Sequence, residues 1–401
     1  MKVIIVGGGP SGLTCAINAK NDHNEVIVLE KNKDIGKKLL VTGAGHCNLF
    51  NQDFSIDKYN SNNKDILEDI INENNKNLVM PFLKSIGIIC KNKGNYIYPM
   101  AYTSVSVLNA LKMACKRLNI QIKTNEEVID IESKDNKYII KTNNNTYEAD
   151  KLIISCGSIA YPSLGSSDTA IKIAKNFNIK CSPFLPSLTG LKSDNKVTKK
   201  WDKLRCDVKL KHFEDDAFIK EEVGEVQLTN YGISGICTFN LSSRIVRNIN
   251  KHKETIKIDF LPDIDNLKDL IKERINTFKD NNPIELLEGL LNYKILYALF
   301  DNTSLISKKN KDLNDNDINL ICKLIKDYSL NITGYNDFDN AQVCSGGILL
   351  SEINPNSFEC NIIKNLFFIG EALDVDGICG GYNLGFAWIS GIICGKYISN
   401  C

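Results

Sequence analysis

Two glycine-rich segments stand at opposite ends of the 401-residue chain. The N-terminal segment reads MKVIIVGGGPSGLTCAINAK, and the segment near the C-terminus reads GEALDVDGICGGYNLGFAWISG. The first has the chemistry to hold the ADP half of a dinucleotide, and the second can close over the other half. An FAD-binding fold needs a site divided in this way, whereas a simple NAD domain does not. We therefore expect the two ends of the chain to meet.

The N-terminal segment predicts a strand, a tight turn and a helix. Residues 2–6 form an apolar run suited to a buried parallel strand, and residues 11–20 have helical character. Between them Gly7, Gly9 and Gly12 complete a G-x-G-x-x-G pattern, in which the glycines serve the turn, the approach of backbone to a pyrophosphate and the packing of helix on strand. The start of the helix offers N–H groups and partial positive charge to the phosphates.

A second apolar strand, residues 25–29, is predicted to end at Glu30. A carboxylate at this spacing accepts hydrogen bonds from the ribose hydroxyls of adenosine and repels a 2′-phosphate, which disfavours NADP here. The alternative interpretation is a glycine-rich turn without a ligand. The ordered succession of strand, glycines, helix, strand and acid favours nucleotide binding over that alternative.

The C-terminal segment carries the features expected around a flavin. Gly370 and Glu371 follow an expected strand at residues 365–369, where glycine lets the chain pass the pyrophosphate and a carboxylate can hold ribityl hydroxyls. The GGYN motif then opens a predicted helix over residues 384–397, whose N-terminus would stabilise negative charge on a reduced flavin. A turn before an ordinary core helix is the alternative. Small residues along this helix are expected to pack against the sheet; they are Gly385, Ala387, Ser390 and Gly391.

The middle of the chain predicts the rest of one domain and an insertion. Helical patterns occupy residues 66–86 and 105–118, and a buried strand occupies residues 152–155. Residues 128–133, 137–142 and 146–150 alternate apolar and polar side chains between Asn-rich turns, which predicts a three-stranded meander. This layout is typical of FAD domains of the glutathione-reductase type, in which Val128 would offer its backbone to adenine.

From about residue 186 the pattern changes. Residues 205–210, 225–229 and 236–241 look like strands of an antiparallel sheet or barrel, and residues 267–278, 284–300 and 318–328 have helical spacing. We predict an FAD-binding domain of residues 1–185 and 343–401, a β-rich substrate-side domain of residues 186–262 and 330–342, and a helical insert of residues 263–329.

Composition narrows the classes of partner. The 49 Lys and Arg residues balance 48 Asp and Glu residues, so the net charge of +1 gives no electrostatic case for nucleic acid. No apolar stretch reaches the roughly 18–20 residues of a membrane helix. Residues 1–6 are expected to form the first strand of the fold and therefore not a signal peptide. Fourteen cysteines occur without a C-x-x-C pair and histidine is scarce, which disfavours a disulfide framework or a zinc site. We therefore expect a cytoplasmic protein that acts on a small-molecule substrate, with no membrane or nucleic-acid partner.

The chain resembles the BaiN/YhiN-like flavoproteins, also called aminoacetone oxidase family FAD-binding enzymes. The motifs GGGPSG, KKLLVTGAGHCN, LIISCGS through YPSLGSSD, LTNYGISGICTFNLS and GEALDVDGICGGYN carry this resemblance along nearly the whole chain. It implies an α/β fold in which a glutathione-reductase-type FAD-binding Rossmann domain is interrupted by a β-barrel-like domain with a helical insert. The resemblance and the glycine motifs together predict that FAD is lined by Gly7, Gly9, Ser11, Gly12, Glu30, Lys31, Lys38, Thr42, Gly45, Asn48, Val128, Gly157, Gly370, Glu371, Gly381, Asn383 and Leu384.

The sequence departs from the family pattern at a few positions. His46 stands where the family usually has Arg, which weakens an expected phosphate or substrate contact. Ser155–Cys156–Gly157 replaces the usual Ala-Thr-Gly. In the inserted domain Asn230 and Ile236 replace a common His and Pro. Because that domain is expected to face the isoalloxazine ring, these changes leave the substrate open.

The predicted activity is that of an FAD-dependent oxidoreductase, which reduces an electron-poor double bond of a small organic substrate using NAD(P)H. No second G-x-G-x-x-G lies between a strand and a helix, so a nicotinamide coenzyme is expected to bind transiently near the flavin. The alternatives are a flavin oxidase of a small amine with O2 as acceptor, a flavoprotein acting on RNA, and a non-catalytic protein with structural FAD.

The sequence does not assign the catalytic acid or base. Tyr161, Tyr231 and Ser234 are candidate proton donors, although packing or turn roles are commoner for such residues. Asp374 and Asp376 resemble catalytic carboxylates, and hydrogen bonds that stabilise a turn are an equal alternative. Cys379 stands beside the flavin loop, but it lacks the nearby partner cysteine of a redox pair.

Overall fold

The structure, a computed structural model, describes residues 1–401. The chain forms two compact units, which are unit 1 (Met1–Pro186 and Phe338–Cys401) and unit 2 (Ser187–Asp337). The return to unit 1 comes at residue 338, earlier than the 343 expected from the sequence, and the predicted helical insert lies inside unit 2. A separate domain for that insert stays a prediction. None of the helices has the length and apolar character needed to cross a membrane.

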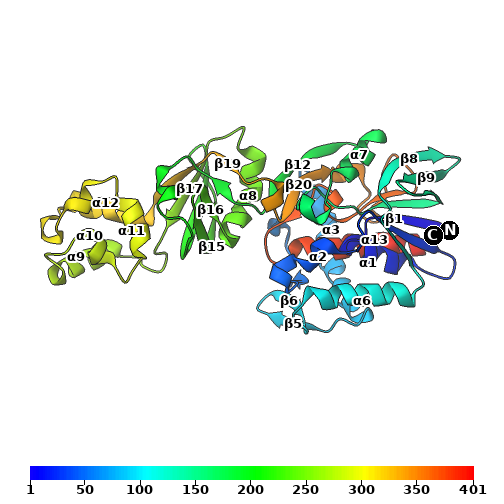
Figure 1. The fold of residues 1–401 in the computed structure, drawn as a ribbon, viewed down its shortest axis with the longest axis horizontal. Coiled ribbons are helices and arrows are strands. Elements are labelled where there is room, and N and C mark those ends of the chain that lie inside the picture. The colour runs from blue at the N-terminus through cyan, green and yellow to red at the C-terminus, as the bar shows by residue number, and fades with distance from the viewer. The chain divides into compact units, whose positions relative to one another are not determined.

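A five-stranded parallel sheet forms the centre of unit 1 (Figure 1). Its middle strand is buried because it is almost wholly apolar, and Val6 pairs with Leu29 on one side and Ile154 on the other. The last strand in the chain pairs with its neighbour in parallel register, so both ends of the sequence contribute to one sheet. In spatial order the strands are β21 (Leu366–Phe368), β11 (Lys151–Ile154), β1 (Lys2–Val6), β2 (Glu25–Glu30) and β7 (Gln121–Thr124).

The predicted meander is present as a separate three-stranded antiparallel sheet. Its strands are β8 (Val128–Lys134), β9 (Lys137–Thr142) and β10 (Thr146–Ala149), in the order β10-β9-β8. Asp135 and Asn136 take positive φ angles of 52° and 60° between β8 and β9, as a tight two-residue hairpin turn requires. Together with the parallel sheet, this meander confirms the predicted fold class.

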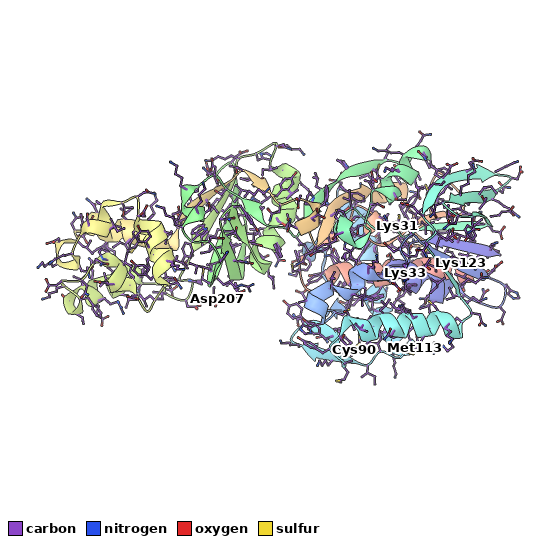
Figure 2. The ribbon with its side chains drawn as sticks, in the orientation of Figure 1. Lys31, Lys33, Cys90, Met113, Lys123 and Asp207 are labelled. Atoms are coloured by element: carbon purple, nitrogen blue, oxygen red, sulfur yellow. The ribbon has the colours of Figure 1, made fainter.

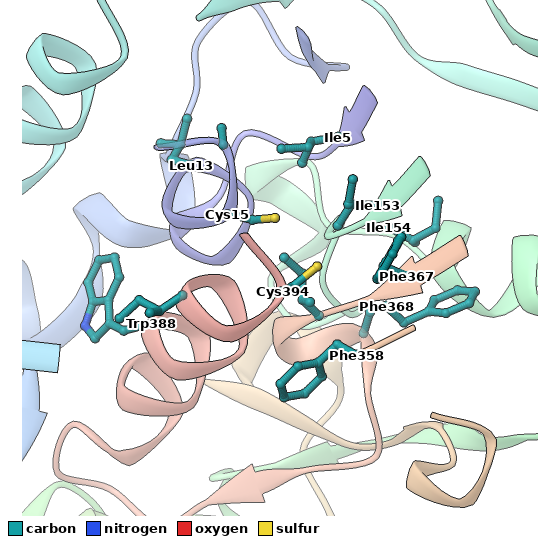
Figure 3. Packing of buried hydrophobic residues seen from close by; sticks show 14 of the residues in the cluster. Ile5, Leu13, Cys15, Ile153, Ile154, Phe358, Phe367, Phe368, Trp388 and Cys394 are labelled. Atoms are coloured by element: carbon teal, nitrogen blue, oxygen red, sulfur yellow. The ribbon is translucent and has the colours of Figure 1, made fainter. Parts of the chain in front are cut away.

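Helices α1 (Pro10–Ala19) and α13 (Tyr382–Ser399), from opposite ends of the chain, pack against each other (Figure 3). A Cβ atom at Gly391 would lie 2.6 Å from the Ser11 carbonyl oxygen, so only glycine allows this approach. The expectation that the small residues of α13 pack on the sheet is therefore wrong for Gly391, which meets α1. Gly385 instead meets the ring of Phe50.

The predicted helix at residues 105–118 is α6 (Ser104–Arg117), but residues 66–86 form three short helices rather than one. The Asn72 side chain accepts a hydrogen bond from the Asn75 N–H and starts a new helix within that region. The remaining elements of unit 1 are α2 (Lys37–Leu40), β3 (Phe50–Asn51), β4 (Tyr59–Asn60), α3 (Lys64–Ile70), α4 (Glu73–Lys76), α5 (Val79–Ser85), β5 (Cys90–Lys93), β6 (Tyr96–Pro99), α7 (Thr169–Asn176), β12 (Cys181–Ser187), β20 (Val343–Ile348) and β22 (Asp376–Gly377).

Unit 2 is built on a seven-stranded antiparallel sheet. Its two longest strands form a hairpin whose turn residues, Asp215 and Asp216, have φ angles of 47° and 69°. Trp201 and Phe260 are fully buried in the core of the unit. In spatial order the strands are β18 (Tyr328–Ile332), β17 (Glu254–Asp259), β14 (Leu204–Glu214), β15 (Ala217–Thr229), β16 (Gly232–Ser234), β13 (Leu191–Lys192) and β19 (Gly334–Tyr335).

The helices of unit 2 depart from the prediction at two places, residues 236–241 and residues 284–300. The predicted strand at residues 236–241 is wrong, because these residues begin helix α8 (Ile236–Asn248). Cys237, Leu241 and Ile245 are buried at helical spacing, and Gly235, with φ 97°, ends the extended backbone before them. The predicted helix at residues 284–300 is divided in two. The other helices are α9 (Leu267–Thr277), α10 (Pro283–Leu287), α11 (Tyr293–Phe300) and α12 (Asp315–Lys326).

Candidate FAD-binding site

The turn between β1 and α1 has the shape that a pyrophosphate requires. Gly7 has φ 111°, and a Cβ atom at Gly12 would lie 2.1 Å from the Gly7 carbonyl oxygen. The backbone conformation at Gly7 and the close contact at Gly12 therefore require glycine at both positions, with or without a ligand. Gly9 differs, because a Cβ atom there would meet nothing within 4 Å. Gly9 is the N-cap of α1 and gives that helix no side-chain cap, so the first N–H groups of α1 are left for a ligand.

Glu30 ends β2 beside this turn and is held in place on both carboxylate oxygens. Oε2 accepts a hydrogen bond from the Gly8 N–H at 2.9 Å, and Oε1 accepts from the Asn32 N–H and Nδ2. Lys31 follows directly in the sequence and is labelled in Figure 2. The carboxylate is thus oriented at the strand end where the sequence predicts the adenosine ribose.

The meander reaches the same strand end. The Glu126 N–H donates to the Glu30 carbonyl oxygen at 2.9 Å, just before Val128 opens β8. Val128 also lines a cavity of about 240 Å³ together with Lys172 and Phe177 of the α7 region. Val128 therefore lies two residues after the point where the chain contacts the end of β2, and its contact with adenine stays a prediction.

Lys38 and Glu371 join the two ends of the sequence. The Lys38 Nζ lies 2.7 Å from Oε2 of Glu371, and both side chains are partly buried. The Ser158 hydroxyl donates to Oε1 at 2.7 Å and the Cys344 N–H donates to it at 3.2 Å. Burial, reinforced by the nearby Glu371 charge, raises the pKa of the Cys344 thiol to about 12. This cluster holds a carboxylate in the loop where the sequence predicts the ribityl chain.

The loop between Gly370 and Gly381 contacts the N-terminal half at two further places. A Cβ atom at Gly370 would lie 2.5 Å from the Ser11 hydroxyl, and one at Gly381 would lie 2.8 Å from Asn48 Oδ1. Gly381 has φ 94° and precedes the first turn of α13. Asn383 Oδ1 and Nδ2 bind the N–H and carbonyl of Gly377, both at 2.8 Å. Asn383 therefore shapes the loop, with Leu384 buried beside it.

Asn48 provides the clearest test of whether these residues fit a ligand. Its Oδ1 is buried and has no hydrogen-bond partner in the protein. A buried acceptor without a partner is costly, and it fits a hydrogen-bond donor on a bound molecule. Open space above Gly45 and Gly157, where a Cβ atom would meet nothing within 4 Å, agrees with this. The residues present therefore fit a flavin nucleotide.

The loop that carries Thr42 and Asn48 is strained. Ala44 and Cys47 have φ angles of 52° and 57°, a region that residues other than glycine seldom adopt. The Thr42 hydroxyl donates to the Leu39 carbonyl oxygen at 2.7 Å. His46 stacks on Tyr102 with ring centroids 4.3 Å apart. The residue that departs from the family pattern thus helps to hold this loop.

The candidate catalytic residues lie in different settings. Asp374 accepts hydrogen bonds from the N–H groups of Gly346 and Asn62, and Asp376 accepts one from a serine hydroxyl. Both aspartates are fully buried, which matches the turn-stabilising alternative. Tyr161 belongs to unit 1 and has a left-handed backbone, with φ 60°. Tyr231 and Ser234 belong to unit 2, and Cys379 precedes the Gly380–Gly381 turn.

Sequence reasoning missed several contacts around the site. Ser158 and Cys344 bind Glu371, and Asn51 Nδ2 donates to the Gly380 carbonyl oxygen at 2.9 Å. The ring of Tyr96 packs on Gly380. Ser158 stands next to the SCG motif and could have been found there. No sequence motif marks Cys344, Asn51 or Tyr96 as site residues, because they reach these loops only through the tertiary fold.

The fold and this geometry define a Rossmann-type flavoprotein. The family model described as HI0933-like protein Rossmann domain matches residues 1–397. The chain belongs to this family, which confirms the resemblance seen in the sequence. It is an FAD-binding oxidoreductase.

Relatives along the whole chain include two kinds of enzyme. A 3-dehydro-bile acid delta(4,6)-reductase of Clostridium scindens is 32% identical, with 98% of each chain covered. A ribosomal RNA dihydrouridine synthase of Haemophilus influenzae is 25% identical, covering 99% of this chain and 98% of the relative. Among solved structures, the 3-ketosteroid delta1-dehydrogenase of Sterolibacterium denitrificans has a TM-score of 0.51 at 11% identity, with 99% of each chain covered. An open flavocytochrome c3 fumarate reductase has a TM-score of 0.50 at 14% identity, covering 100% of this chain and 78% of that one. These structures show the fold alone.

Proposed function

We propose that the protein reduces a carbon–carbon double bond conjugated to a carbonyl group in a steroid-like ring compound, with NAD(P)H as the electron donor. The observation that carries this proposal is the 32% identity along the whole chain to the bile acid reductase. FAD, when bound, would transfer two electrons from the coenzyme to the substrate. The substrate would gain a hydride at one carbon and a proton at the other.

The chain's own residues would bind and orient the partners. Gly9 and the open start of α1 would hold the pyrophosphate, and Glu371, fixed by Lys38 and Ser158, would hold the ribityl chain. The start of α13 would place partial positive charge beside the ring system. These contacts support the cofactor-binding set predicted from the sequence.

Tyr161 is our candidate for the proton donor. Its strained backbone, with φ 60°, is held by a hydrogen bond from its N–H to the Phe338 carbonyl oxygen. Such strain concentrates at functional sites, and Tyr161 lies three positions after Ser158, which binds Glu371. A phenol at this position would protonate the substrate carbon that does not receive the hydride. We expect Tyr161→Phe to slow turnover by about 100-fold without changing the FAD content.

The direct test follows the flavin absorbance without oxygen. We expect NADH or NADPH to bleach the purified yellow protein, and a 3-oxo steroid with double bonds at positions 4 and 6 to restore the colour. The saturated 3-oxo steroid is the matched control and should leave the flavin reduced. Bleaching by a small amine in place of NADH or NADPH, followed by recovery of the colour with O2 and release of hydrogen peroxide, would instead support the oxidase alternative. A flavin that no donor reduces would contradict the proposal and support a structural role for FAD.

A second candidate substrate is uridine in ribosomal RNA. The dihydrouridine synthases of Haemophilus influenzae and Escherichia coli are 25% and 26% identical to nearly the whole chain. Uracil also holds a double bond conjugated to a carbonyl, so the chemistry is shared. The net charge of +1 argues against tight RNA binding. This candidate would be supported if the NAD(P)H-reduced protein formed dihydrouridine in ribosomal RNA and did not turn over the steroid.

A further inference from the structure

A buried cluster of ionisable side chains lies in unit 2, on the paired strands β14 and β17. Glu214 and Glu254 stand directly opposite each other in the antiparallel register. His212, two residues before Glu214, points to the same face of the sheet. One ligand-type atom from each of these three residues lies within 4.8 Å of the others.

All three side chains are removed from water. His212 and Glu254 are 1% and 2% exposed, and Glu214 is 8% exposed. Two facing carboxylates repel each other, and burying them is costly unless cations and hydrogen bonds compensate. The cluster therefore needs positive charge from another source.

The protein supplies that charge to one carboxylate and not to the other. Arg244 of α8 donates from Nε and a terminal nitrogen to the two oxygens of Glu214 at 2.6 and 2.8 Å, and Asn248 adds a third hydrogen bond. Glu254 Oε2 shares a hydrogen bond with His212 Nε2. Glu254 Oε1 is buried with no hydrogen-bond partner.

We infer that this cluster is a binding site for a divalent transition metal ion, with the His212 imidazole and the Glu214 and Glu254 carboxylates as ligands. Zn²⁺ and Mn²⁺ accept this mixture of nitrogen and oxygen ligands. A proton on His212 would balance the negative charge of Glu254 but leave Glu254 Oε1 without a partner. A bound metal ion would both balance that charge and give Glu254 Oε1 a partner. Arg244 and Asn248 would orient the Glu214 ligand from behind. The site does not depend on the flavin or on the proposed reductase activity.

The test uses the full-length flavoprotein after dialysis against a chelator. We expect calorimetric titration with Zn²⁺ or Mn²⁺ to show one site per chain, and elemental analysis after gel filtration to recover about one equivalent. If neither ion binds the wild-type protein above the level of a buffer blank, the inference is overturned and the cluster is an internal ion-pair network. Because this measurement is made on the wild-type protein, its result does not depend on whether a variant folds.

Two variants locate the site. Glu254→Gln keeps the side-chain volume and should weaken metal affinity by at least about 10-fold. His252→Ala is the matched control, because His252 pairs with Asp215 in the same unit but is exposed. It should bind metal like the wild type. Unchanged FAD content in both variants shows that unit 1 is intact. Equal affinity in Glu254→Gln and wild type would place the metal elsewhere and overturn the assignment.

Discussion

Each unit of the molecule contains one of the two tryptophans, and their surroundings differ in an instructive way. Trp388 in unit 1 and Trp201 in unit 2 are both fully buried. The Trp388 indole donates to the Leu49 carbonyl oxygen, 339 positions away, whereas Trp201 donates to the Thr229 carbonyl oxygen, 28 positions away. Unit 1 is closed by the two ends of the chain, and unit 2 is one continuous segment. Cofactor binding should therefore depend on long-range closure in unit 1 alone.

The largest expected effects come from the tryptophans. Trp388→Ala and Trp201→Ala should each cost about 3–5 kcal/mol in the unit concerned, because each removes a large buried ring. Trp388→Ala should also release FAD, because Trp388 ties α13 to the N-terminal half. Trp201→Ala should retain it. Hydrogen exchange measured for each unit along a denaturant titration, with FAD content measured alongside, checks both. Loss of FAD in Trp201→Ala would contradict the expectation that FAD binding depends on unit 1 alone.

Two glycines in one motif should separate folding from binding. Gly12→Ala places a Cβ atom 2.1 Å from a backbone oxygen and should lower the free energy of unfolding of the apoprotein by about 1–3 kcal/mol or more. Gly9→Ala meets no protein atom and should leave the apoprotein as stable as the wild type. It should nevertheless weaken FAD binding by about 10-fold or more, because the added methyl would occupy the pyrophosphate position. Thermal unfolding with and without FAD measures both quantities. Normal FAD affinity in Gly9→Ala would contradict the predicted pyrophosphate site.

A smaller effect is expected at the Lys38–Glu371 pair. Each of Lys38→Met and Glu371→Gln should reduce FAD affinity by about 10-fold, or about 1.4 kcal/mol, because the pair orients the carboxylate. The double variant should lose less than the sum, since the two residues act together. Fluorescence titration of the apoprotein with FAD provides the values. Lys200→Met, which breaks the Lys200–Asp301 pair of unit 2, is the control and should not change FAD affinity.

The smallest expected effect concerns pH. The Cys344 pKa is raised from 9.0 to about 12, so the folded protein keeps a proton that the unfolded chain releases above about pH 9. This thiol therefore lowers the free energy of unfolding as pH rises from 9 towards 12, and has no such effect below pH 9. Cys344→Ser should have a shallower decline in this range than the wild type. Denaturation curves at pH 8 and pH 10 test the sign, and equal slopes would contradict the burial of this thiol.

The sequence predicted unit 1 more fully than unit 2. Residues 2–6, 128–133 and 137–142 are strands almost as expected, because apolar runs and alternation between turns report local structure directly. At residues 236–241 the same reasoning failed. A short apolar run is compatible with a strand or a helix, and burial of Leu241 and Ile245 in the core of unit 2 favours the helix.

For the candidate site, the sequence indicated candidate residues but not the contacts that they make. Asp374 and Asp376 have the chemistry of acids, yet both are buried among hydrogen-bond donors that the motif did not reveal. The cofactor-binding positions stay predictions, now supported by the contacts of Glu371 and the unpartnered oxygen of Asn48.

By itself the sequence determined the glycine-rich turn between β1 and α1, because glycine has no Cβ atom and so allows the positive φ of Gly7 and the close approach at Gly12. It also indicated that a second segment, from Gly370 onward, would complete the site. Only the tertiary structure decided that Lys38 meets Glu371, that Asn48 Oδ1 lacks a partner and that Glu214 faces Glu254. Those contacts depend on chain closure and strand register, which join residues that no local pattern relates.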